Sequence, residues 1–189
     1  MSDPDRMPPI PADRMTPVQR EAAREIVAGR RGDLSGPFVP ALRSPEFLRR
    51  LQRLGEYLRY DLALPPRLRE LAILLTAREW SQEFEWDVHA PLAQQAGLQP
   101  SVVDAIREGR RPGDMGRDET LIYEFFAELQ RSKSVSDTTY AAAVDAFGEQ
   151  GVIDLVGAIG YYTTLAMIMN VARTPLPPGK TRVLPALPR

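Results

Sequence analysis

The chain contains no cysteine and only one histidine among its 189 residues. The absence of cysteine excludes disulfides, thiolate nucleophiles and cysteine-ligated zinc sites. It also excludes turnover by a peroxidatic thiol, because neither a sulfenic acid nor a disulfide can form. The single histidine is His89. Any proton transfer that uses an imidazole of this chain must therefore use His89.

The chain also lacks an excess of charge of either sign, since it has 24 Lys and Arg residues and 25 Asp and Glu residues, for a net charge of -1. This balance gives no long-range attraction for a polyanion, so we expect no nucleic-acid partner. Residues 1–14 lack the apolar run of a signal peptide, and polar residues interrupt the most apolar stretch, 152–171. We therefore predict a buried core helix at 152–171, no membrane association and a cytoplasmic protein.

Apolar residues recur at helical spacing along most of the chain, and prolines fall where helices should begin. The pattern predicts an all-α fold in one domain, 16–173, between a flexible N-terminus, 1–15, and a proline-rich C-terminal arm, 174–189. Residues 32–40 are expected to be a loop. Helices are expected to begin at Pro17, Pro45, Pro66 and Pro100, and to cover about 81–96, 118–131, 136–147 and 151–173.

The helix predicted at 81–96 contains His89 and an internal proline, Pro91. Pro91 removes the backbone hydrogen bond to the Asp87 carbonyl, so we expect a kink close to the histidine. Gly97 is expected to adopt a left-handed conformation just past the end of this helix.

Spacings of three, four and seven residues place four side chains on one face of this helix: Gln82, Glu85, Trp86 and His89. A carboxylate four residues before a histidine can accept its N–H, fix its tautomer and raise its basicity. We predict that Glu85 orients and charges His89 in this way and leaves the other ring nitrogen for a substrate. The alternative is an ordinary exposed side-chain pair with no catalytic role.

Glu70 lies among apolar residues of the preceding helix and can face the helix of His89 if the two pack antiparallel. Alternatively, Glu70 is a surface carboxylate paired with Arg67 or another arginine. A cluster of Glu70, Glu85 and His89 could also bind a metal ion. With so few ligands and no second histidine this is less favoured, and we predict neither a metal nor another cofactor.

Residues 65–98, PPRLRELAILLTAREWSQEFEWDVHAPLAQQAGL, resemble the signature helix pair of the carboxymuconolactone decarboxylase family, which includes the alkylhydroperoxidase D type proteins. In the peroxidase branch a glutamate is followed by Cys-x-x-Cys-x-x-x-His. The matching residues here are Glu70, Gln82, Glu85 and His89. Since both cysteine positions are occupied by other residues, the chain is more similar to the decarboxylase branch, which needs no thiol pair.

The resemblance implies an alkylhydroperoxidase D-like helical bundle assembled into a trimer or hexamer. The helix pairs that begin at Pro65 and Ser136 have similar lengths and a similar short turn, which also allows a degenerate repeat of helix pairs. The resemblance also implies a cofactor-independent enzyme that decarboxylates or isomerises a small lactone or enol carboxylic acid. His89 would move a proton at carbon, Glu85 would be its partner, and Glu70 would be a second relay group.

Three further residues are expected to contact the substrate. Gln82 and Arg69 would bind a carboxylate or enolate oxygen, and Trp86 would form an apolar wall. The alternative function is a non-catalytic helical oligomer that binds a metabolite. An enzyme should place His89 at a partly buried cavity with Glu70 within a hydrogen bond or one water of it. The binding module predicts a closed or solvent-flooded stripe, and an exposed His89 with no cavity would favour it.

Overall fold

A computed structural model describes residues 4–186 and shows only helices and connecting segments over that range. The predicted all-α fold class is therefore confirmed. The helices are α1 (Pro17–Ala28), α2 (Phe38–Ala41), α3 (Pro45–Glu56), the π-helical turn η1 (Tyr57–Asp61), α4 (Pro66–Glu79), α5 (Glu83–Gln95), α6 (Pro100–Arg107), α7 (Arg117–Ser132) and α8 (Asp137–Ala172).

The helix ends follow the capping chemistry of the sequence. The Thr16 hydroxyl accepts a hydrogen bond from the Gln19 amide at the start of α1, and prolines occupy the first turn of α1, α3, α4 and α6. Gly97 has φ of 96° after α5, as predicted. Two details differ from the expectation: the loop 32–40 includes the short helix α2, and α3 continues into η1.

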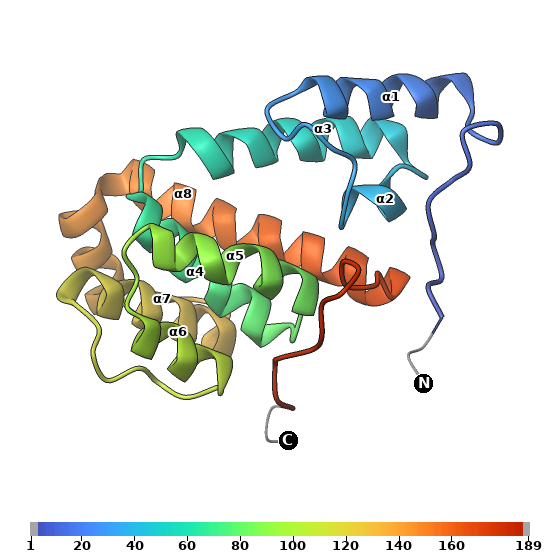
Figure 1. Ribbon diagram of the computed structural model, residues 1–189. Helices are drawn as coiled ribbons and strands as arrows, with labels where there is room; N and C mark the ends of the chain where they lie inside the picture. Colours follow the sequence, from blue (N-terminus) through green and yellow to red (C-terminus); the bar gives the residue numbers. More distant parts are fainter. Residues whose placement is uncertain (1–3, 187–189) are drawn as a thin grey trace.

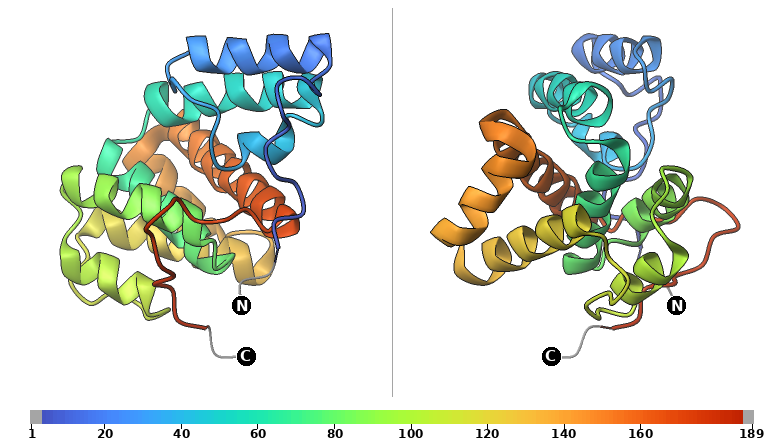
Figure 2. Two further views of the ribbon diagram at one scale, coloured as in Figure 1. Left: turned by 45° about the vertical axis from the view of Figure 1, so that its right-hand side comes forward. Right: turned by 90° about the vertical axis from the view of Figure 1, so that its left-hand side faces the viewer.

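The helices form two layers (Figures 1 and 2). α1 and α3 lie side by side in one layer with α2 beside them, and the second layer contains α4 to α8. α4 lies at the centre of the second layer, where it contacts α5, α6, α7 and α8 and is buried along most of its length. The site described below lies where α5 and α8 of the second layer meet the segments that lead into and out of α3.

α8 is two helices joined end to end at Gly148, whose φ of 69° and ψ of 169° interrupt the helical backbone. The predicted helices at 136–147 and 151–173 are therefore both present, with no loop between them. A degenerate repeat of helix pairs stays a prediction. By length and composition α8 could cross a membrane, but a buried core helix passes the same test, and 56% of its most apolar window is buried inside the protein.

Both terminal segments pack against the helices. The Arg6 amide donates to the Ala172 carbonyl at the end of α8. In the C-terminal segment, the Val183 and Leu184 amides donate to the carboxylate of Glu83 on α5. The proline-rich arm is therefore held on the helices over its described part. Flexibility of residues 1–15 stays a prediction, and residues 1–3 and 187–189 lie outside the described range.

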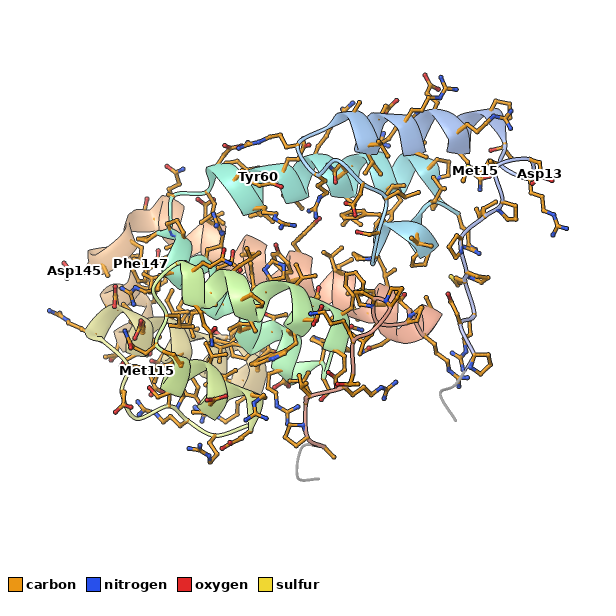
Figure 3. The ribbon with its side chains drawn as sticks, in the orientation of Figure 1. Asp13, Met15, Tyr60, Met115, Asp145 and Phe147 are labelled. Atoms are coloured by element: carbon orange, nitrogen blue, oxygen red, sulfur yellow. The ribbon has the colours of Figure 1, made fainter. Side chains whose placement is uncertain are left out.

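Asp154 of α8 connects the two layers. Its buried carboxylate accepts hydrogen bonds from the Tyr57 hydroxyl and the Ala63 amide, each 2.9 Å long. Both donors flank the part of η1 that carries Arg59 and Tyr60, so one carboxylate fixes both ends of η1 on α8. Tyr60 extends from this turn in Figure 3.

Replacing Asp154 by asparagine should lower the free energy of unfolding by about 1 kcal/mol, because the amide has one acceptor oxygen for two donors, which are only partly buried. Urea unfolding followed by circular dichroism measures the change. Asp145→Asn is the matched control on the same helix, since Asp145 is exposed and has no hydrogen bond or ion pair within residues 4–186. Equal stability of the two variants would contradict the role given to Asp154.

Candidate functional site

The structure joins Glu70 and His89 directly. α4 and α5 are consecutive helices that pack closely, and His89 Nδ1 lies 2.7 Å from Glu70 Oε2. Both side chains are buried, with exposures of 4% for His89 and 3% for Glu70. A carboxylate can only accept, so Nδ1 carries the proton of this hydrogen bond. The second ring nitrogen, Nε2, has no hydrogen-bond partner in the part of the chain that the structure describes.

The environment of Glu70 favours its ionised form. Burial raises the pKa of this carboxyl, but the hydrogen bond and charge of His89, together with Arg69, outweigh burial and hold the pKa below its ordinary value. Arg69 Nε lies 3.3 Å from Glu70 Oε1. Arg69 was expected to bind the substrate, but the structure places it beside Glu70 and away from the cavity that His89 lines.

Glu85 lies one helical turn before His89 but does not bond to it, so the predicted Glu85–His89 hydrogen bond is wrong. His89 Nδ1 is hydrogen-bonded to Glu70 of α4 instead. Neither carboxyl oxygen of Glu85 has a hydrogen-bond partner within residues 4–186. Because the side chain is only 3% exposed, burial raises the pKa of Glu85 well above its ordinary value of 4.5. The site thus combines an ionised carboxylate with a carboxyl group that favours the neutral acid.

His89 and Glu85 line a cavity of about 250 Å³ between the two layers. The cavity is lined from four parts of the chain: the loop into α2, η1, α5 and α8. Its lining residues are Arg31, Asp33, Ser35, Pro37, Phe38, Arg59, Tyr60, Phe84, Glu85, Val88, His89, Tyr162 and Leu165. Glu70 does not line it. Since Glu70 occupies Nδ1 of the imidazole, Nε2 is the nitrogen available to a ligand in the cavity.

The cavity lining also includes Tyr162 and two arginines that were not predicted from the sequence, Arg31 and Arg59. The Tyr162 ring meets the His89 ring edge to face, with centroids 5.1 Å apart. Burial raises the pKa of the Tyr162 hydroxyl, which has no hydrogen-bond partner in the described range. Tyr162 therefore restricts the His89 ring as a neutral phenol. The arginines come from segments distant in sequence, and no local motif indicates their convergence.

Gln82 and Trp86 are placed elsewhere than expected. α5 begins at Glu83, so Gln82 is its N-cap: its side chain accepts from the Phe84 amide and donates to Asn170 Oδ1, 2.8 Å away. Trp86 is 3% exposed and belongs to the hydrophobic core. Neither residue lines the cavity beside His89. The helix start removes Gln82 from the predicted stripe, and core packing turns Trp86 away from the cavity.

Within the described residues, no group of three or more Asp, Glu or His side chains is arranged to hold a metal ion. The considered cluster of Glu70, Glu85 and His89 is instead a hydrogen-bonded pair beside a desolvated carboxyl. What this arrangement offers is acid–base chemistry: an oriented imidazole, an ionised partner and a neutral acid at one cavity.

Residues 45–114 match the family model described as the carboxymuconolactone decarboxylase family. The resemblance predicted from residues 65–98 is therefore confirmed. The matched segment includes Glu70, Glu85 and His89, and begins after Arg31. A comparison with curated proteins finds no match to the chain.

Proposed function

We propose that the protein is a cofactor-independent acid–base enzyme that decarboxylates or isomerises a small lactone or enol carboxylic acid, a function that the match of residues 45–114 to the carboxymuconolactone decarboxylase family model supports. One observation carries the proposal. His89 is bonded through Nδ1 to a buried carboxylate and lines a cavity in which its other nitrogen has no partner. This is the arrangement that general acid–base catalysis requires of a histidine.

In the decarboxylation, the bond between the substrate carbon and its carboxylate breaks and carbon dioxide leaves. The bonding electron pair passes into a dienolate, and protonated His89 delivers its Nε2 proton to carbon. Glu70 stabilises the imidazolium before the transfer and holds the ring orientation throughout. In an isomerisation, His89 would remove a proton from one carbon and return it to another.

Glu85 has a different role here from the one predicted from its spacing. As a neutral acid it would donate a hydrogen bond to the carbonyl oxygen of the lactone, where negative charge develops in the dienolate. Its two unpartnered oxygens and its place in the cavity wall support this assignment. Thiol peroxidase activity has no part in the proposal, because the chain has no cysteine.

A panel of small lactones and enol carboxylates, incubated with the purified protein, tests the function. Carbon dioxide release detects decarboxylation, and uptake of solvent deuterium at carbon detects isomerisation. We expect at least one compound to react in a His89-dependent manner. If no compound releases carbon dioxide or exchanges a proton faster than it does with the His89→Ala variant, the proposed function is wrong.

The alternative of a non-catalytic binding module predicted a closed or solvent-flooded stripe. The cavity that His89 lines and the bond of His89 to Glu70 favour catalysis over that alternative. The substrate remains the partner that we propose, and a cytoplasmic location stays a prediction.

A homo-oligomer, as a trimer or hexamer, also stays a prediction. Large apolar side chains of α8 and α3 are exposed in the single chain, among them Ile153 at 69%, Val171 at 58% and Leu54 at 48%. Light scattering of the purified protein should give a mass about three or six times that of the 21.1 kDa chain. A purely monomeric mass would contradict the prediction.

A further inference from the structure

We propose that Arg31 and Arg59 together form an anion subsite in the cavity, and that this subsite binds a carboxylate group of the ligand. The inference rests on the proposed function in taking that ligand to be the substrate. Arg31 precedes the matched family segment, whereas Arg59 lies inside it. The N-terminal part of the chain would therefore supply half of a specificity-determining site to the family core.

Arg31 is held in place by neighbours that do not neutralise its charge. Its Nη2 donates to the Tyr161 hydroxyl at 3.2 Å, and its guanidinium carbon lies 4.4 Å from the centroid of the Phe38 ring. Its Nε is buried and has no partner within residues 4–186. An arginine that is fixed by a phenol and a ring, and that lines a cavity without a carboxylate partner, is preorganised for an anion.

The backbone at Gly55 is built for this contact. A Cβ at Gly55 would lie 2.0 Å from the Tyr161 hydroxyl oxygen and 2.9 Å from Arg31 Nη2. Only glycine leaves room there for the tyrosine and arginine to meet. Burial raises the pKa of Tyr161 to about 12, so this hydroxyl remains neutral and leaves the charge of Arg31 uncompensated.

Arg59 has no carboxylate partner in the described part of the chain, although it lies on η1 beside acidic neighbours. Its guanidinium carbon is 5.6 Å from the Tyr60 ring centroid. Arg30 shows the contrasting arrangement: it forms an ion pair with Asp61 at 2.9 Å, packs over the same ring and does not line the cavity. Of these arginines, the two that line the cavity are thus the ones without a carboxylate partner.

The acids around the cavity do not balance the two arginines. Glu85 is buried and favours the neutral acid, and Glu70 is bonded to His89 outside the cavity lining. Asp33 lines the cavity but is exposed and forms no ion pair with either arginine. The cavity is therefore net positive at its arginine side. A carboxylate can accept from the planar fork of one guanidinium and from the second as well.

Matched pairs of ligands test the subsite. Each small γ-lactone carboxylate, starting with 5-oxotetrahydrofuran-2-carboxylate, is compared with its methyl ester by calorimetric titration at pH 7.5. In the wild-type protein the acids should bind at least tenfold more tightly than the esters. Arg31→Gln and Arg59→Gln should each weaken binding of the acids about tenfold or more and leave binding of the esters unchanged. Arg31→Lys should retain part of the preference.

Arg30→Gln is the matched control, because it removes the adjacent, already paired arginine and should leave both ligands unaffected. Thermal melting of each variant separates lost binding from lost folding, and the ester provides a second check on the cavity. If no acid in the panel binds more tightly than its ester, or if Arg31→Gln and Arg59→Gln bind acids as the wild type does, the subsite is wrong.

Repeating the titration with His89→Ala separates this inference from the proposed function. Selective binding of acids that persists in His89→Ala, without any turnover by the wild type, would support the subsite and refute the enzyme. His89-dependent turnover that Arg31→Gln and Arg59→Gln leave unchanged would support the enzyme and refute the subsite.

Discussion

His89→Gln should lower kcat/KM on a turned-over lactone or enol acid by about 100-fold or more, which is the usual contribution of a general acid or base. The glutamine amide cannot exchange a proton near neutral pH, although its volume resembles that of the imidazole. Glu70→Gln should cause a loss of about 10- to 100-fold. The amide can still accept the Nδ1 proton, but it no longer stabilises the imidazolium by charge.

A double variant, in which both Glu70 and His89 are replaced by glutamine, tests whether the two side chains act together. If the two side chains act as one unit, the double variant should be no slower than His89→Gln within about threefold. Glu79→Gln on the same helix is the control, since Glu79 is exposed and has no hydrogen bond or ion pair within the described range. Independent, additive losses at Glu70 and His89 would contradict the bonded pair, and near-wild-type rates in His89→Gln would remove its catalytic role.

The fold was largely predictable because its signals are local. Thr16 and Ser136 cap helices through their own hydroxyls, and Gly97 adopts the positive φ that follows a helix end. The break at Gly148 also agrees with the gap between two predicted helices. The missed helix α2 is a single turn with no side-chain cap, and a segment of that kind leaves little trace in hydrophobic periodicity.

The site was predictable only in part, because its contacts cross between elements. The family pattern indicated Glu70 and His89 as members of one site, and they meet. Helical spacing alone favoured Glu85 as the partner of His89. Spacing predicts which side chains of one helix share a face. It does not predict which side chain of a neighbouring helix forms the hydrogen bond with the imidazole.

The arginines were missed for a related reason. Arg31 and Arg59 line the cavity because the first layer packs on α5 and α8. The sequence alone gives no reason to assign different roles to the adjacent residues Arg30 and Arg31. What separates the adjacent arginines is the ion pair that one makes with Asp61 and the other does not. Such a difference depends on side-chain direction in the folded chain.

Glu85 should have a large effect on how the free energy of unfolding depends on pH. Because burial raises its pKa in the folded protein, the folded state holds one more proton than the unfolded state from the ordinary value of 4.5 up to the raised value. Stability is therefore highest below this window and falls as the pH rises through it, by at most about 1.4 kcal/mol per pH unit. Glu70, whose pKa is lowered, acts in the opposite sense at acid pH.

Glu85→Gln should remove this loss, because the amide does not ionise. Urea unfolding of the variant and the wild type at pH 5, 6, 7 and 8 measures the difference in stability. The contribution of Glu70 to the pH dependence cancels in this difference, because both proteins contain Glu70. The advantage of the variant should grow with pH. Glu79→Gln should remain within about 0.5 kcal/mol of the wild type at each pH, as an exposed substitution does. An advantage of Glu85→Gln that stays constant from pH 5 to 8 would show that Glu85 is ionised in the folded protein. That result would also contradict the proposed role of Glu85 as a neutral acid that donates a hydrogen bond to the lactone carbonyl.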